Sequence, residues 1–172
     1  MRHIWLSLLA LLFIVMEGMV VNLLPPSLLF AEWFIIPHWT LVFLLLMSIY
    51  FDSSETYVSL WYALVSGLFI DIIYTDILGV HMMVYVIVVY IIHGVNKLLQ
   101  SNLLVVALLV LTGVAMADTL LYVVYSFLNL TDLPWGTYAG NRLWPTLLAN
   151  AIVFLFISLF LKNVMQKWAD DD

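Results

Sequence analysis

The chain has 172 residues, of which 66% are hydrophobic and 9% are charged, and its mean hydropathy is +1.14. A soluble domain of this size is closer to half apolar and a quarter charged, so almost all of this chain is expected to lie in a membrane. The formal net charge of -6 argues against a nucleic-acid partner, and the absence of cysteine excludes disulfides, thiolate metal sites and cysteine nucleophiles.

Six apolar segments predict a polytopic, all-α membrane protein, in which residues 1–172 form a single domain. The predicted spans are roughly 4–24, 34–51, 57–73, 80–95, 102–125 and 143–161. The first span has no small-residue cleavage site, so it is interpreted as a retained span and not as a signal peptide.

Two of these spans are short. The second is interrupted by Pro37, and residues 39–51 alone would extend about 20 Å at 1.5 Å per residue. Including residues 34–36 gives a kinked span of adequate length. The fourth span, 80–95, is also short, so one of the two could instead be re-entrant.

Basic residues and tryptophans predict the orientation of the spans. Six crossings place both termini on the same side of the membrane. If that side is the cytoplasm, Arg2, Lys97, Lys162 and Lys167 are cytoplasmic and only Arg142 lies outside, as the positive-inside rule requires. The seven tryptophans all lie near predicted boundaries, as expected for an aromatic belt.

Several polar residues fall within the outer half of these spans. Glu17, Asp71 and Asp118 are acidic, Arg142 enters the last span from the same side, and Asn150 lies about two turns deeper. Each acid costs roughly 2.5–3.5 kcal/mol on insertion scales, so the three together imply compensation. One interpretation is a polar cluster at the outer ends of four spans. The other is that each residue reaches water separately near a helix end.

Small residues recur at helical spacing in two spans, where they would let a second helix approach closely. They are Ser59, Ala63 and Gly67, on a face that ends at Asp71, and the pair Gly113 and Ala117. The helix that packs there could belong to this chain or to a partner. Residues 74–79 predict a tight external turn, with Asp76 as a turn residue and Gly79 suited to a positive φ.

No catalytic or metal-binding signature accompanies these residues. HExxH, GxSxG and GxxxxGK[ST] are absent, and the four histidines lack zinc spacing. The spacing of Asp71, Asp76 and His81 crosses a turn, which disfavours a metal site. We therefore expect no cofactor and no enzymatic activity. Asp52 and Glu55, in a short cytoplasmic loop, are expected to be solvated.

The order and spacing of these motifs resemble the MreD family of bacterial rod shape-determining membrane proteins. The resemblance covers nearly the whole chain, although the terminal KNVMQKWADDD does not match and the role of this acidic tail stays open. The matching residues are Glu17 in the first span, Gly67, Asp71, Leu78 and Gly79 in SGLFIDIIYTDILGVHM, and Arg142, Pro145 and Asn150 in NRLWPTLLAN.

The resemblance implies a non-enzymatic scaffold in the bacterial cytoplasmic (inner) membrane, surrounded by membrane lipids. It implies docking of MreC, and through MreC an indirect association with MreB filaments, RodA and a class B penicillin-binding protein. It also implies a six-helix fold similar to the substrate-binding component of energy-coupling-factor transporters. The alternative function is therefore vitamin binding, with Glu17, Asp118 and Arg142 lining an outward-facing pocket.

Overall fold

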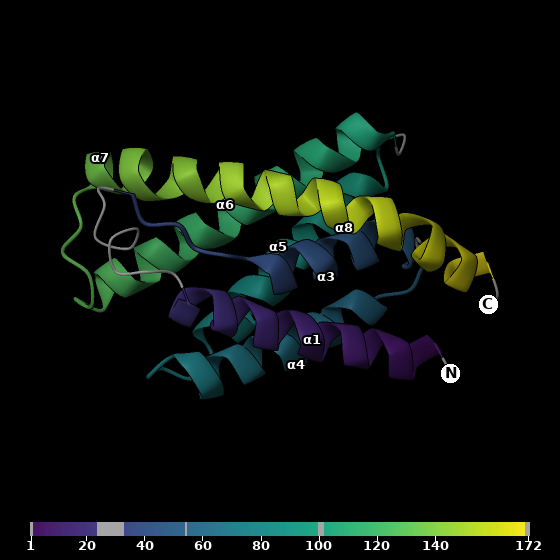
Figure 1. Cartoon of the computed structure of the whole chain (residues 1–172), viewed down its shortest axis with the longest axis horizontal. Coiled ribbons are helices and arrows are strands. Elements are labelled where there is room, and N and C mark those ends of the chain that lie inside the picture. The colour runs from purple at the N-terminus through teal and green to yellow at the C-terminus, as the bar shows by residue number, and fades with distance from the viewer. Residues whose placement is uncertain (1, 24–32, 54, 100–101, 171–172) are drawn as a thin grey trace.

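Six long helices form a bundle in the computed structural model of the protein, which describes residues 2–23, 33–53, 55–99 and 102–170 (Figure 1). No strand occurs in these ranges, which confirms the all-helical fold. The long helices are α1 (Arg2–Leu23), α3 (Trp39–Tyr50), α4 (Val58–Tyr74), α5 (Val80–Asn96), α6 (Leu103–Phe127) and α8 (Trp144–Asp170). The short α7 (Trp135–Thr137) and the π-helix η1 (Tyr138–Leu143) lead directly into α8.

Three helical segments of the described chain are long and apolar enough to cross a membrane. They are Arg2–Val20, Leu103–Phe127 and Trp135–Ala169. The other three helices, α3, α4 and α5, are equally apolar but shorter. The protein is therefore a membrane protein, in which the short α3 is enclosed while the short α4 and α5 keep exposed apolar faces.

Helix α3 is the centre of the bundle. Every residue from Thr40 to Tyr50 is buried, and α3 contacts α1, α4, α5, α6 and α8. A helix that is apolar on all sides belongs in a core. Its twelve residues extend only about 18 Å. A helix this short can serve as the core because the surrounding helices separate it from lipid.

The start of α3 differs from the predicted kinked span. Residues 33–38 are not helical, and the helix begins only at Trp39. Pro37 explains the difference, because a proline disfavours helical backbone in the residue before it and removes one N–H donor. The second predicted span is thus a non-helical stretch, residues 33–38, which we call the extended segment, followed by a short helix.

The two ends of the described chain lie at the same end of the bundle (Figure 1). Arg2 Nη1 donates a hydrogen bond to the Trp168 carbonyl at 3.2 Å. We call this the terminal end, and the opposite end, where α4 turns into α5 and α6 into α7, the distal end. The connection between the fifth and sixth predicted spans is shorter than their bounds imply, since helix continues to Phe127 and resumes at Trp135.

Asp52, in the loop after α3, was expected to be solvated, but its carboxylate is bound within the chain. Its carboxylate accepts hydrogen bonds from the backbone N–H groups of Val58 and Ser59 and from the Ser59 hydroxyl. These N–H groups lie in the first turn of α4, where helical backbone has no acceptor of its own. Glu55 is exposed, as expected.

Residues 25–31, which lie between the first two predicted spans, and the last two residues of the acidic tail lie outside the described residues.

Candidate functional site

The polar residues of the distal half form one larger network and two separate contacts. Asp118 and Arg142 bind each other, and His38 links them to Asn150, because its ring nitrogen lies 3.4 Å from Asp118 and its backbone N–H donates to Asn150 Oδ1. Glu17 and Asp71 each bind the first turn of another helix. The five residues of the predicted outer cluster therefore do not form one hydrogen-bonded group.

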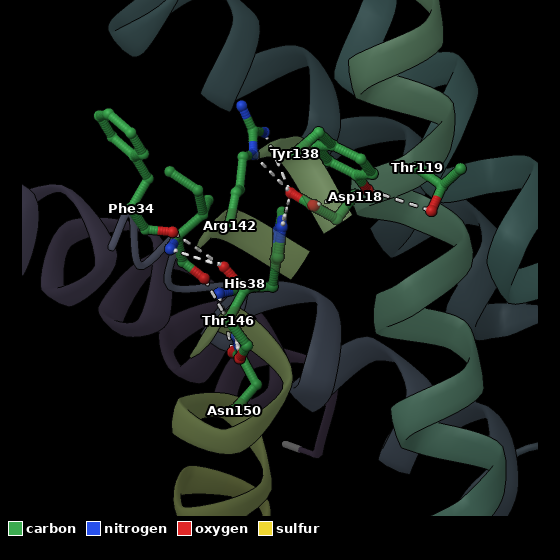
Figure 2. Close-up of polar contacts among 9 residues, drawn as sticks. Phe34, His38, Asp118, Thr119, Tyr138, Arg142, Thr146 and Asn150 are labelled. Carbon is green, nitrogen blue, oxygen red and sulfur yellow. Dashed lines mark hydrogen bonds and ion pairs between the residues drawn. The ribbon is translucent and has the colours of Figure 1, made fainter. Parts of the chain in front are cut away.

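Asp118, on α6, is fully buried and has a full set of partners (Figure 2). Nε and Nη2 of Arg142 both donate to Asp118 Oδ1, at 3.2 and 3.0 Å. The Tyr138 hydroxyl donates to Oδ2 at 2.9 Å, and His38 Nε2 lies 3.4 Å from Oδ1. A buried carboxylate is tolerated in a membrane segment when a cation and further donors surround it, as they do here.

The π-helix η1 supplies two of these partners, Tyr138 and Arg142. Tyr138 is fixed by stacking on Tyr122, with ring centroids 4.0 Å apart and an interplanar angle of 13°. Single π-turns inside α-helices occur frequently at functional sites, because the wider turn changes which side chains face inward. Pro145, the second residue of α8, has no N–H to donate to the Asn141 carbonyl, four residues earlier. That carbonyl instead accepts from Phe34 N–H at 2.7 Å.

Side chains of α8 replace the missing helical partners of the extended segment (Figure 2). Thr146 Oγ1 accepts from Ile36 N–H at 3.1 Å. Asn150 Oδ1 accepts from His38 N–H at 2.9 Å, while Asn150 Nδ2 donates to the Ile36 carbonyl at 3.0 Å. Irregular backbone at membrane depth is tolerated only where protein satisfies it. Asn150 therefore acts as a substitute for a neighbouring backbone unit.

Glu17 provides the acceptor at the start of α3. Its Oε2 accepts from Thr40 N–H at 3.1 Å, although Glu17 belongs to α1. The N-terminus of a helix has unpaired N–H groups and a partial positive charge, so a carboxylate there is stabilising. Glu17 thus caps a helix that it does not belong to.

Asp71 does the same for α5. It is fully buried at the end of α4 and accepts from the N–H groups of Gly79, His81 and Met82 at 2.8, 3.0 and 3.2 Å. The His81 ring nitrogen Nδ1 lies 2.9 Å from Asp71 Oδ1. Asp71, the acid that is unusual in this apolar run, therefore caps the start of α5 and joins α4 to it.

The turn between these helices contains Asp76 and Gly79. Asp76 is exposed, and Gly79 has a φ of 95° directly before α5. This left-handed conformation is accessible to glycine at little steric cost. It directs the backbone N–H groups at the start of α5 toward Asp71.

The small-residue faces pack within the chain. A Cβ atom at Gly67 would lie 2.5 Å from the Met82 Cα, and one at Gly113 would lie 2.7 Å from Leu45 Cδ1. The backbone of α4 therefore touches that of α5, and α6 lies directly against α3. The other members of the two faces, Ser59, Ala63 and Ala117, are also fully buried. These faces leave no room for a partner helix.

Sequence patterns did not single out His38, Tyr138 or Thr146, and they presented His81 beside Asp71 only as a candidate metal ligand. No periodicity links these residues to their partners. His81 offered the one available signal, ten residues after Asp71 across a predicted turn. Within the described residues, no group of three or more His, Asp or Glu side chains could hold a metal ion.

Comparisons with known proteins agree on one family. The sequence profile of the family described as rod shape-determining protein MreD matches residues 1–168. The Rod shape-determining protein MreD of Bacillus subtilis (strain 168) is 23% identical over 139 residues, covering 78% of this chain and 79% of that protein. No solved structure matches the chain. The likeness to a transporter component thus stays a prediction.

Proposed function

Because the chain belongs to the MreD family of rod shape-determining proteins, we propose that it is a non-enzymatic scaffold of the bacterial cell-elongation machinery. In this proposal it crosses the cytoplasmic membrane several times with both termini in the cytoplasm. It docks MreC and so helps couple MreB filaments to RodA and a class B penicillin-binding protein during lateral peptidoglycan synthesis. The family match over nearly the whole chain is the observation that carries the proposal.

The use of the buried polar groups supports a scaffold. Glu17 and Asp71 each hold the start of another helix, and Asp118 joins α6 to η1. These contacts join separate helices and so stabilise the bundle. A rigid bundle with apolar outer faces is suited to binding other membrane helices.

We place the MreC contact in a groove between α1 and α4, because the small-residue faces are internal. Two adjoining cavities of about 150 and 200 Å³ form the groove, and Ser7, Tyr62 and Val65 line both. The Ser7 and Tyr62 hydroxyls lie 3.2 Å apart on the outer side of the bundle. Both hydroxyls also donate to the His3 carbonyl, so it is the small residues of the groove, Ser7, Ala10 and Ser66, that favour a partner, because they permit close helix approach. The proposed occupant is the single transmembrane helix of MreC.

Groove-filling variants test this contact. Val65→Trp and Leu11→Trp place a large ring in the groove, at side chains that are 47% and 46% exposed. We expect each to reduce co-purification of MreC in mild detergent by at least fivefold and to round the cells. Leu155→Trp, at a 54% exposed position on α8, is the matched control and should leave both unchanged.

Two outcomes would contradict the proposal at different levels. Wild-type recovery of MreC by both groove variants would place the contact elsewhere on the bundle. Failure of the unmodified protein to retain MreC would reject the docking function itself. Substitutions of Gly67 or Asp71 are unsuitable for this test, since they would disturb the packing of α4 on α5.

The vitamin-binding alternative loses part of its basis. It required Glu17, Asp118 and Arg142 to line a common pocket. In the structure Arg142 and Asp118 bind each other, and Glu17 lies at the start of α3.

A further inference from the structure

A cavity of about 550 Å³ lies in the distal half, between α1, the extended segment, α4 and the start of α5. Its apolar walls include Ile36, Ile70 and Ile73, and its polar lining includes Glu17 and His81. The volume is within the range of small-molecule sites, about 300–1,000 Å³. This combination of apolar walls and two ionisable side chains is suited to an amphiphilic ligand.

Each ionisable side chain uses one atom for the fold and keeps another. Glu17 Oε2 accepts from Thr40 N–H, and His81 Nδ1 pairs with Asp71. Among the described residues, the hydrogen bonds of Glu17 come from Thr40 alone, with the His38 ring nearby, and no hydrogen bond is made by Nε2 of His81. The residues that contain these atoms both line the cavity. The cap at α3 therefore accounts for Glu17 Oε2 but not for the other carboxylate oxygen.

Charge indicates what the remaining oxygen would bind. Arg142 already donates two hydrogen bonds to Asp118, so it is committed to another carboxylate. A carboxylate at membrane depth needs a cation or several donors. A ligand ammonium group would provide both a positive charge and hydrogen-bond donors for Glu17.

We propose that this cavity binds a protonated amine carried on an apolar or amphiphilic molecule. The ammonium group lies against Glu17, His81 forms a second hydrogen bond, and Ile36, Ile70 and Ile73 contact the apolar body. The amine could be supplied by an aminophospholipid headgroup or by a soluble organic amine. The site is separate from the proposed MreC groove, with which it shares none of its described lining residues.

Two binding measurements on the full-length purified protein distinguish the sources. In the first, the protein is taken from vesicles of equal phosphatidylethanolamine and phosphatidylglycerol, and retained lipid is counted by native mass spectrometry. In the second, thermal unfolding is followed with phenethylamine or with phenethyl alcohol, which has the same shape but no charge. At least fivefold retention of phosphatidylethanolamine over phosphatidylglycerol identifies a lipid headgroup. Stabilisation by the amine alone identifies a soluble ligand.

Variants locate the binding in the cavity. Glu17→Gln removes the charge but keeps an acceptor for Thr40 N–H, and Ile73→Trp fills the space without changing charge. We expect each to abolish the preference for the amine. Glu55→Gln, which changes an exposed acid at the terminal end, is the control and should bind as the unmodified protein does.

The proposal is overturned if the unmodified protein shows neither preference, or if both cavity variants bind the amine normally. Thermal unfolding without ligand shows first whether each variant is folded. If Glu17→Gln fails to fold, Ile73→Trp alone decides. None of these results depends on MreC, so the site and the docking function can fail independently.

Discussion

Asp118 shows how a single buried charge is held in place by separate parts of the chain. Its side chain has no exposed surface, and its partners are Arg142 and Tyr138 from η1 and His38 from the extended segment. Removing one member of a buried ion pair leaves an uncompensated charge, which typically costs about 3–5 kcal/mol, whereas replacing both members can be neutral. The Asp118–Arg142 pair should therefore behave non-additively.

A double-mutant cycle measures this coupling. We expect Arg142→Leu to lower the free energy of unfolding by about 3–5 kcal/mol, and Asp118→Leu combined with Arg142→Leu to cost less than the single change. Thermal or denaturant unfolding of the purified protein in detergent provides the measurement. Tyr138→Phe, which removes one hydrogen bond to the same carboxylate, should cost about 1.5–3 kcal/mol. Strict additivity of the two leucine substitutions would show that the pair contributes no coupling.

Sequence reasoning at this scale identified the charges but not their partners. The cost of an acid in an apolar run is enough to single out Glu17, Asp71 and Asp118. Which donor each one meets depends on where helices lie beside one another, and on the π-turn that places Arg142 and Tyr138. Neither is encoded in local periodicity. For that reason the sequence did not identify His38 as a partner of Asp118 or His81 as a partner of Asp71.

Among the helices, the α4–α5 pair shows how closely the backbones approach. Gly67 faces the Met82 backbone so directly that a Cβ atom would lie 2.5 Å from Met82 Cα. Gly94, on α5, has nothing within 4 Å of its own virtual Cβ. The two glycines therefore predict opposite effects for the same substitution.

Gly67→Ala and Gly94→Ala form a matched pair of variants. The first should destabilise the protein by about 1–3 kcal/mol, because helical backbones must separate to admit the methyl group. The second should stabilise it by roughly 0.5–1 kcal/mol, since alanine is preferred to glycine within a helix. Unfolding midpoints of the two purified variants test the contrast. Equal effects would mean that Gly67 is not a packing contact.

Helix boundaries followed from the sequence where turns and polar residues end an apolar run. Helices α1, α4, α5 and α6 begin and end within two residues of their predicted spans. The second and sixth spans differ. Pro37 replaces the expected kink with non-helical backbone, whereas α8 begins within one residue of its predicted start and continues to Asp170, beyond the predicted end at 161. A proline marks an interruption, but the partners of the freed backbone groups determine its form.

The molecule as a whole presents two distinct ends. Arg2 meets the carbonyl of Trp168 at the terminal end, while residues 75–79 and 128–134 form turns at the distal end. The charge distribution predicts that the terminal end faces the cytoplasm. Hydropathy and charge are sufficient for this prediction, because both act on the whole chain and do not depend on detailed packing.

Single-cysteine labelling tests this orientation, since the chain contains no cysteine of its own. Asp132→Cys lies in the exposed distal turn and Glu55→Cys in the exposed terminal loop. We expect a membrane-impermeant maleimide to label Asp132→Cys in intact spheroplasts, and to label Glu55→Cys only after lysis. The reverse pattern would invert the proposed topology. Labelling of both before lysis would show leaky spheroplasts, which a cytoplasmic marker protein detects.

The pairing of the extended segment with α8 also constrains how the chain is inserted. Residues 36 and 38 leave the ribosome more than a hundred residues before Thr146 and Asn150, their hydrogen-bond partners. Until α8 arrives, this backbone must be satisfied by water or by the insertion machinery, because lipid offers no partner. The second segment thus cannot reach its final depth as an independent unit. Completion of the core therefore waits for the synthesis and insertion of α8.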